Sequence, residues 1–142
     1  LTKLLVPTLI ENAKHTKFSP QIVNIGSVAG YYVYPKGVVY CASKFAVRAI
    51  TEGLRMDLLG TGIKVSSVSP GMVETEFSQV RLKNTKLAKA VYNGMTPLTA
   101  QDVAETIHWI LTRPKAVNVQ DIILYPTDQA SPSQVFRRPI KN

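Results

Sequence analysis

Three residues of types that could transfer a proton lie close together in the stretch IVNIGSVAGYYVYPKGVVYCASKFAV, residues 22 to 47. Ser27 precedes Tyr40 by thirteen positions, and Lys44 follows Tyr40 by four. Residues four apart project from the same face of a helix, so a helix through this region would hold Tyr40 and Lys44 side by side. The stretch therefore contains a hydroxyl, a phenol and an amine that could serve one site.

These three side chains suit the reduction of a carbonyl group, or the reverse oxidation of an alcohol. A carbonyl that is being reduced gains negative charge on its oxygen and needs a proton donor and a hydrogen-bond donor. A free phenol has a pKa of about 10, but a lysine ammonium about 5 Å away stabilises the phenolate by roughly 3 kcal/mol and lowers that pKa by about two units. No side chain donates hydride, so this chemistry requires a nicotinamide cofactor.

Each of these residues also has a plain structural interpretation. A Tyr and a Lys four positions apart are commonly an exposed helical pair, and a loop serine commonly bonds nearby backbone groups. The position of Ser27 favours the chemical interpretation, because it follows by two residues the apolar run QIVNI, which is typical of a buried strand. Open α/β sheets bind ligands at the carboxyl ends of their strands.

The other elements are predicted from hydrophobic periodicity, glycine and proline. Strands are predicted at residues 21 to 25, 63 to 71 and 119 to 125, and helices at residues 1 to 13, 38 to 60, about 80 to 93, and 99 to 114. Pro7 is expected to kink or weaken the first helix, and Gly60 to end the second. Thr99, with Asp102 three positions later, is predicted as an N-cap. Strands that alternate with helices predict a parallel sheet in an α/β fold.

Three strands are fewer than a doubly wound parallel sheet usually contains. No G-x-G-x-x-G or G-x-x-x-x-G-K-[ST] motif occurs, and the chain opens on LTKLLVPTLIENAKH, without an initiator Met. The predicted fold class is a Rossmann-like doubly wound parallel sheet that lacks its N-terminal nucleotide-binding half. Residues 1 to 142 are accordingly expected to be the C-terminal part of a single domain.

Composition restricts the class of protein. The 142 residues are 45% hydrophobic and 18% charged, as in globular proteins, and no apolar run approaches the roughly 20 residues that span a bilayer. The single cysteine, Cys41, excludes an internal disulfide framework, fits a cytoplasmic setting and is expected to be a small packing residue. His15 and His108 have no partner at metal-ligand spacing, so no metal site is expected.

A net charge of +8 also occurs in proteins that bind nucleic acid. Here the Lys and Arg residues are scattered, apart from a short cluster of Arg137, Arg138 and Lys141. A solvated surface with a basic tail accounts for this pattern. We therefore expect a small-molecule substrate as the partner, and neither nucleic acid nor a membrane.

Three motifs, NIGSVAG, YCASKFAV and VSPGMVETEF, resemble in order and spacing the core of the short-chain dehydrogenases/reductases. The resemblance runs from about Leu4 to about Tyr125. Within the family, the segments PGMVETEFSQVR, TPLTAQDVAE and LYPTDQAS look most like the NADP-dependent 3-hydroxy acid (serine or allo-threonine) dehydrogenases. The resemblance implies an oxidoreductase that uses NADP, with NAD as the other cofactor to consider, on a small hydroxy or keto substrate.

The resemblance also implies roles for individual residues. Tyr40 would be the general acid and base, Lys44 would support it and bind the nicotinamide ribose, and Ser27 would hold the substrate oxygen. These assignments agree with the chemistry that the three residue types indicate by themselves.

A second group of residues is implied to bind the cofactor. Pro70 and Gly71 would turn the chain beside the nicotinamide. Val73 would meet the carboxamide through backbone groups, and Thr75 would bind the carboxamide or pyrophosphate side. The segment from about residue 74 to 93 would close over the substrate.

Several family features are absent, namely the glycine-rich T-G-x-x-x-G-x-G turn, the N-N-A-G segment, the asparagine that supports the lysine, and the residue that selects NAD or NADP. A non-catalytic fragment kept for subunit contact is therefore an alternative. In this family the helices at residues 1 to 13 and 38 to 60 typically pair with another subunit, giving a homodimer or homotetramer. The intact set of Ser27, Tyr40 and Lys44 favours catalysis.

Two expectations concern other aromatic residues. Trp109 is predicted to lie in the core beside Ile110. One of Tyr31, Tyr32 and Tyr34, which follow Ser27, is expected to line the substrate pocket.

Overall fold

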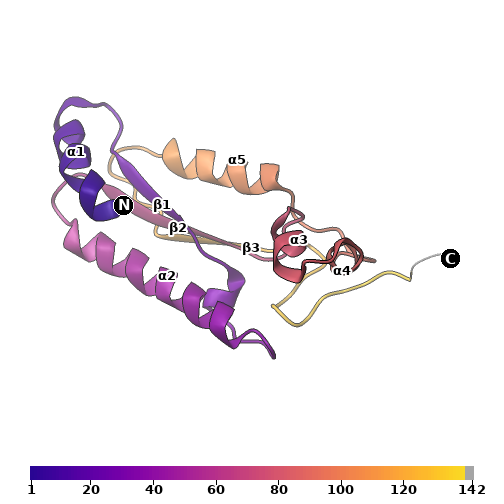
Figure 1. Ribbon diagram of the computed structural model, residues 1–142. Coiled ribbons are helices and arrows are strands. Elements are labelled where there is room, and N and C mark those ends of the chain that lie inside the picture. Colours follow the sequence, from indigo (N-terminus) through magenta and orange to yellow (C-terminus); the bar gives the residue numbers. More distant parts are fainter. Residues whose placement is uncertain (140–142) are drawn as a thin grey trace.

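The computed structural model describes residues 1–139, in which helices and strands alternate (Figure 1). The helices are α1 (Thr2–His15), the 3-10 helix η1 (Val28–Gly30), α2 (Val38–Asp57), α3 (Phe77–Leu82), α4 (Thr85–Ala90) and α5 (Ala100–Leu111). The strands are β1 (Gln21–Ile25), β2 (Lys64–Pro70) and β3 (Asp121–Leu124). Lys141, the last residue of the basic cluster, lies outside the described residues.

The three strands form one parallel sheet in the order β1-β2-β3, which confirms the predicted α/β class. Ile22 of β1 pairs with Val65 of β2, and Val68 of β2 pairs with Ile122 of β3. Within residues 1–139, no strand pairs with the outer side of β1, so β1 and β3 are the two edges of this sheet.

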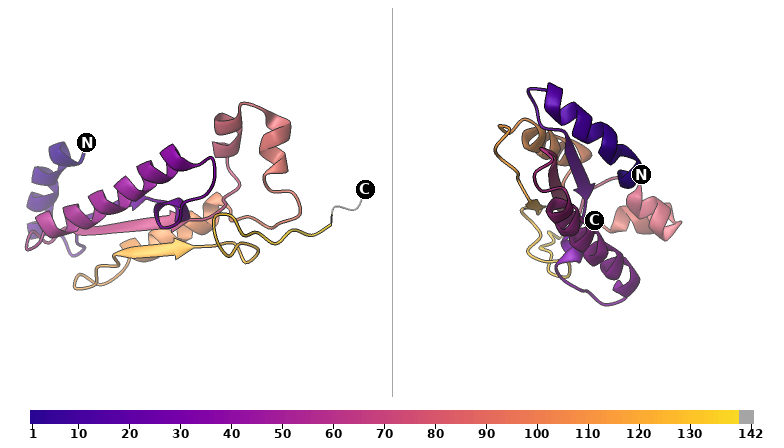
Figure 2. Two further views of the ribbon diagram at one scale, coloured as in Figure 1. Left: turned by 90° about the horizontal axis from the view of Figure 1, so that it is seen from below. Right: turned by 90° about the vertical axis from the view of Figure 1, so that its left-hand side faces the viewer.

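Helices cover both faces of the sheet, with α2 on one side and α5 on the other (Figure 1 and Figure 2). Side chains of successive strand residues point to opposite faces, and their hydrogen bonds show which helix each face meets. Asn24 donates from Nδ2 to the hydroxyl of Thr51 in α2 at 2.9 Å. Lys64 points the other way and donates to the carbonyl of Arg113, just after α5, at 3.1 Å.

The main apolar core lies where α1 and the end of α2 meet β2. Its buried members are Leu58, Ile63 and Val65, and the partly buried side chains packed on them are Val6, Leu9, Ile10, Ile22 and Leu54. Pro7 removes one backbone donor from α1, as expected of an internal proline. The helix nevertheless continues from Thr2 to His15, because the residues on both sides of Pro7 are held by this packing.

Two predictions about helix boundaries were wrong. α2 ends at Asp57, and Gly60 instead forms part of the following turn with a φ of 83°. The region of residues 80 to 93, expected as one helix, contains parts of both α3 and α4. Lys83 adopts a left-handed conformation with φ 49°, which stops α3, and the side chain of Asn84 then caps α4.

The prediction that Trp109 belongs to the core was also wrong. Its neighbour Ile110 is fully buried against the sheet, whereas 47% of Trp109 is exposed. Successive residues of a helix are about 100° apart around its axis, so two neighbours cannot both face the sheet. On the outer face, the guanidinium of Arg113 lies 4.5 Å from the centroid of the Trp109 ring.

The first two residues of the basic cluster do not form a solvated tail. Arg138 makes two hydrogen bonds to the carboxylate of Asp128, at 2.6 and 2.9 Å. Arg137 donates to the carbonyls of Val91 and Asn93 in the segment after α4. Arg137 therefore holds the C-terminal segment against the chain that precedes α5, whereas the ion pair of Arg138 and Asp128 lies within the segment after β3.

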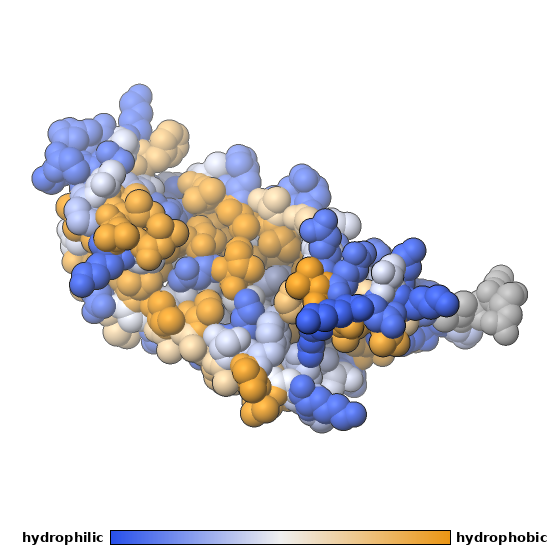
Figure 3. Space-filling view, viewed as in Figure 1, coloured by the Kyte–Doolittle hydropathy of each residue, from blue (hydrophilic) through white to orange (hydrophobic). Residues whose placement is uncertain are grey.

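No helix within residues 1–139 is long and apolar enough to cross a membrane. Apolar side chains nevertheless reach the surface, and Figure 3 shows them gathered over α1 and the region beside it. Leu1, Leu4 and Phe18 are mostly exposed, and Ile25 at the end of β1 is half exposed. Contiguous apolar surface of this kind occurs at protein contacts, membrane contacts and ligand-binding grooves.

Thr99 caps α5 as predicted. Its side chain accepts a hydrogen bond from the Asp102 N–H. In return, the Asp102 carboxylate accepts a hydrogen bond from the Thr99 N–H at 2.7 Å. Thr99→Ala is expected to lower the free energy of unfolding by about 1 kcal/mol in urea denaturation of the complete gene product. The control is Thr106→Ala, whose hydroxyl bonds only the Asp102 carbonyl. It should be neutral or slightly stabilising, because alanine is the better helix former. Equal losses would contradict the capping assignment.

Candidate active site

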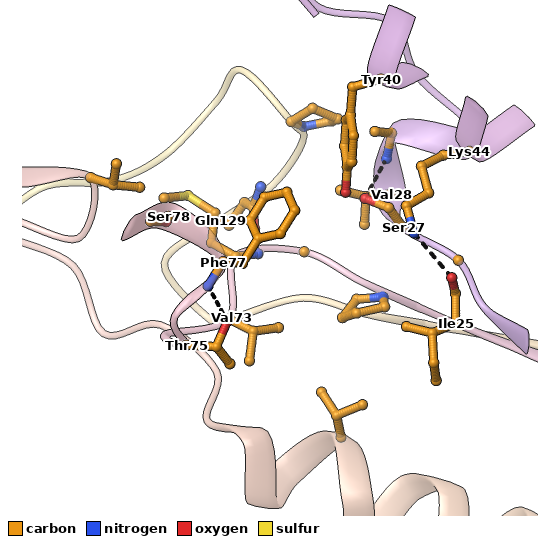
Figure 4. Close-up of a pocket in the computed structure, with 18 of the residues that line it drawn as sticks. Ile25, Ser27, Val28, Tyr40, Lys44, Val73, Thr75, Phe77, Ser78 and Gln129 are labelled. Atoms are coloured by element: carbon orange, nitrogen blue, oxygen red, sulfur yellow. Dashed lines mark hydrogen bonds between the residues drawn. The ribbon is translucent and has the colours of Figure 1, made fainter. Parts of the chain in front are cut away.

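Ser27 lies just beyond the carboxyl end of β1, where the chain turns into η1. Its extended backbone (φ −171°, ψ 156°) allows its Oγ to accept a hydrogen bond from the N–H of Ala29 at 3.1 Å. This is the local bond expected of an ordinary loop serine. The hydroxyl keeps its own proton for donation, and Figure 4 shows Ser27 beside the cavity that Tyr40 enters.

Tyr40 and Lys44 are one helical turn apart near the start of α2. The Nζ of Lys44 lies 5.8 Å from the centroid of the Tyr40 ring and donates to the carbonyl oxygen of Ile25 at 3.1 Å. Partial burial lowers the pKa of the Lys44 ammonium from its ordinary value. Figure 4 shows the Tyr40 hydroxyl pointing toward Ser27, so the phenol and the hydroxyl face the same space.

β2 ends at Pro70, and the chain then turns beside the same cavity. A Cβ at Gly71 would overlap the side-chain oxygen of Gln129, so this position has no room for a side chain. The same oxygen accepts a hydrogen bond from the Met72 N–H at 2.8 Å. Gln129 is buried, and it therefore holds the turn in place from the segment after β3.

The backbone carbonyl of Val73 is hydrogen-bonded, whereas its N–H has no acceptor among the described residues. Its carbonyl accepts a hydrogen bond from the hydroxyl of Tyr92 at 2.8 Å. Its parallel bridge with Leu98 uses the N–H groups of Leu98 and Glu74, so the Val73 N–H has no acceptor among the described residues. Thr75, two residues on, is exposed and accepts from the Phe77 N–H at 3.3 Å.

All the residues predicted to form the site line one cavity of about 490 Å³. They are Ser27, Tyr40, Lys44, Pro70, Gly71, Val73 and Thr75. They meet because β1 and β2 are parallel neighbours, so the segments that leave their carboxyl ends lie at the same edge of the sheet. Of the three tyrosines after Ser27, Tyr34 lines this cavity.

The cavity also contains side chains to which the sequence assigned no individual role. The ring centroid of Phe77 lies 5.8 Å from that of Tyr40, and the guanidinium carbon of Arg81 lies 5.7 Å from the Tyr40 centroid. Both residues belong to α3, and Gln129, from the segment after β3, also lines the cavity. Gln129 lies in the segment LYPTDQAS, but its partner Met72 is 57 positions away, so only the folded chain reveals this contact.

Within residues 1–139, no three His, Cys, Asp or Glu side chains gather in a way that could hold a metal ion. The arrangement at the cavity is instead a set of proton and hydrogen-bond donors. Ser27, Tyr40 and Lys44 supply two hydroxyls and an amine, and the Val73 N–H supplies a free backbone donor. Such a set can bind an oxygen atom that gains negative charge and can deliver a proton to it.

Comparison with known proteins shows the family to which the sequence is similar. Residues 1–86 match the family described as short chain dehydrogenase. Sulfoacetaldehyde reductase 2 of Chromohalobacter salexigens is 48% identical over 131 residues, which are 92% of this chain and 50% of that protein. The NADP-dependent 3-hydroxy acid dehydrogenase of Schizosaccharomyces pombe is 40% identical over 125 residues, which are 87% of this chain and 48% of that protein.

The fold is similar to that of a solved structure described as the closed form of serine dehydrogenase complexed with NADP+. The TM-score is 0.85 at 36% sequence identity, over 97% of this chain and 54% of the other. This similarity confirms the predicted Rossmann-like fold class. The chain spans about half the length of the curated relatives it matches.

Proposed function

The chain belongs to the short-chain dehydrogenase family, and we propose that it is the C-terminal part of a single catalytic domain that transfers hydride between NADP(H) and a small hydroxy or keto substrate. The observation that carries this proposal is that Ser27, Tyr40 and Lys44 line one cavity at the carboxyl end of the sheet. A fragment kept only for subunit contact would not need this set together.

In the proposed reaction, Tyr40 exchanges a proton with the substrate oxygen. Ser27 donates a hydrogen bond to the same oxygen and stabilises the negative charge that develops there. The ammonium of Lys44, 5.8 Å from the Tyr40 ring centroid, stabilises the phenolate that remains when Tyr40 has given up its proton. In the oxidation direction the phenolate accepts the proton of the alcohol.

The residues present fit the nicotinamide half of the proposed cofactor, which when bound would supply or accept the hydride. The free N–H of Val73 would donate to the carboxamide, and the hydroxyl of Thr75 would bind the carboxamide or pyrophosphate side. Lys44 and Tyr40 would bind the ribose hydroxyls. NADP is proposed because two similar proteins are described with it, although NAD would present the same nicotinamide ribose to these groups.

The proposed substrates are small 3-hydroxy acids and related alcohols. Similar proteins are described as a 3-hydroxy acid dehydrogenase, a serine dehydrogenase and a sulfoacetaldehyde reductase, whose named compounds all carry an acid group next to a short carbon chain. A cavity of about 490 Å³ is large enough for such a compound beside a nicotinamide ring.

We further propose a cytoplasmic homodimer or homotetramer formed through α1 and α2. Val38 and Val39 at the start of α2 and Leu59 just after its end are largely exposed apolar side chains, as a helix awaiting a partner would present. Cys41 is buried and free, as is usual in a reducing compartment. Light scattering of the purified complete gene product would give the subunit number.

The function is tested by incubating the complete gene product with NADP+ and a panel of small alcohols, including serine and 3-hydroxypropionate, and following the formation of NADPH by absorbance. Turnover of at least one compound, and oxidation of NADPH with the corresponding carbonyl, is the expected result. If no compound in either direction is converted while NADPH binds, the catalytic proposal is wrong and the subunit-contact alternative gains support.

Residues 1 to 142 expressed by themselves are expected neither to bind NADPH with micromolar affinity nor to turn over. The outer side of β1 exposes unpaired backbone groups and a half-exposed Ile25, so the isolated piece should aggregate or self-associate. The pyrophosphate would also lack a helix N-terminus to bind it. NADPH fluorescence titration, with size-exclusion chromatography, measures both properties. Micromolar binding by a monodisperse monomer would show that these residues form a complete domain.

A further inference from the structure

The cavity has an uneven distribution of charge. Lys44 and Arg81 are its only charged lining residues within the described part of the chain, and none of the lining side chains is a carboxylate. The proposed reaction gives Lys44 a role beside Tyr40 and the ribose. It gives no role to Arg81, which is exposed and carries the second positive charge at the cavity.

Arg81 lines the cavity beside the ring of Tyr40. It lies in the last turn of α3, and its guanidinium carbon is 5.7 Å from the centroid of the Tyr40 ring. Its Nη1 is 3.5 Å from the hydroxyl of Tyr34, which also lines the cavity. At this distance the bond is weak.

Arg81 has no carboxylate partner among the described residues, in contrast to Arg138, which makes two short bonds to Asp128. A guanidinium has five N–H donors in a planar fork that matches the two oxygens of a carboxylate or sulfonate. Apart from the long contact with Tyr34, the donors of Arg81 have no partner among residues 1–139.

We propose that Arg81 binds the acid group of the substrate and makes the site select acids over neutral alcohols of the same size. This inference rests on the proposed function, because it takes the reacting oxygen to lie at Tyr40. Covalent bonds are about 1.5 Å long, so the hydroxyl oxygen of a 3-hydroxy acid lies about 4 Å from its carboxylate carbon. The guanidinium carbon lies 5.7 Å from the centroid of the Tyr40 ring, so an acid group a few bonds from the reacting oxygen would lie near Arg81.

Arg81 also lies near enough to Tyr40 to act on the phenol rather than on the substrate. The two roles differ in what they change. Loss of a residue that binds the acid group raises KM for acids and leaves neutral alcohols unaffected. Loss of a charge that supports the Tyr40 phenolate instead lowers kcat for every substrate and shifts the pH profile.

The test compares Arg81→Gln with wild type in the complete gene product. Steady-state kinetics with NADP+ are measured on 3-hydroxypropionate and on 1,3-propanediol, which replaces the carboxylate by a neutral hydroxymethyl group. We expect Arg81→Gln to raise KM for 3-hydroxypropionate by about 100-fold and to change KM for 1,3-propanediol by less than about threefold. Arg81→Lys should recover part of the loss, because it restores the charge without the fork.

Arg113→Gln is the matched control. Arg113 also stacks on an aromatic ring, that of Trp109, but lies outside the cavity. The Arg113→Gln substitution should leave the KM values for 3-hydroxypropionate and 1,3-propanediol unchanged. A second measurement needs no turnover: isothermal titration calorimetry of the NADP+-loaded protein with malonate, a dianion that cannot be oxidised at a hydroxyl. Wild type and Arg113→Gln should bind malonate, and Arg81→Gln should bind it at least about tenfold more weakly.

The outcomes distinguish a failure of the acid-binding role of Arg81 from a failure of the proposed function. If wild type oxidises these alcohols but Arg81→Gln affects both equally, or neither, the acid-binding role is wrong while the proposed function stands. If wild type converts no compound, the proposed function is wrong. Malonate binding that Arg81→Gln leaves unchanged overturns the assignment of Arg81 whatever the kinetics show.

Discussion

Tyr40→Phe is expected to lower kcat by at least about 100-fold, the usual contribution of a general acid, while NADPH still binds. The substitution removes only the hydroxyl that faces Ser27 and keeps the ring that packs beside Phe77 at 5.8 Å. Stopped-flow measurement of NADPH oxidation separates the chemical step from substrate binding and product release.

The control for this variant is Tyr32→Phe. Tyr32 lies on the same segment of the chain, is mostly exposed and does not line the cavity. Its loss of a hydroxyl should leave kcat unchanged. Near-normal turnover by Tyr40→Phe would remove Tyr40 as the proton donor, and with it the reaction proposed for this site.

Lys44→Met is expected to affect both the chemistry and the cofactor. At 5.8 Å from the Tyr40 centroid and an effective dielectric constant of about 20, the ammonium stabilises a phenolate by about 3 kcal/mol, so its removal should lower kcat by about 100-fold. The loss of its bond to the nicotinamide ribose should also weaken NADPH binding, by about tenfold. Lys14→Met on α1, where the exposed lysine pairs with Glu11, is the control.

The pH dependence of kcat gives an independent check on Lys44. Burial lowers the pKa of this ammonium, so its positive charge is lost as the pH rises through a pKa below that of an ordinary lysine. As the pH is raised, the kcat of wild type should therefore fall at a lower pH than it would if Lys44 had the pKa of an ordinary lysine. If Lys44→Met keeps the turnover and NADPH affinity of wild type, the amine has neither of the proposed roles.

Local sequence patterns predicted the elements and the edge of the sheet at which the site lies. A β-branched run followed by Ser27, and a second run that ends at Pro70, were enough to place both segments at the carboxyl edge, because parallel strands all end on the same side. The four-residue spacing of Tyr40 and Lys44 depends only on helical geometry. The N-cap at Thr99 likewise depends on residues within one turn.

Contacts between distant segments decided the remaining features. Trp109 and Ile110 are equally apolar in sequence, and only the direction from which the sheet meets α5 buries one and exposes the other. The break between α3 and α4 depends on a left-handed Lys83, a conformation that a lysine rarely adopts without support from its surroundings.

The sequence by itself therefore determined the family, the parallel α/β class and the three residues able to transfer and stabilise a proton. These features depend on short motifs, on residue spacing within one helix and on the common direction of parallel strands. The tertiary structure alone decided what surrounds them. It brings Arg81 beside the Tyr40 ring and Gln129 beneath the turn at Gly71, across separations of 41 and 58 positions in the chain. Such contacts depend on how whole helices and strands pack together, and the hydrophobic periodicity of the sequence does not predict them.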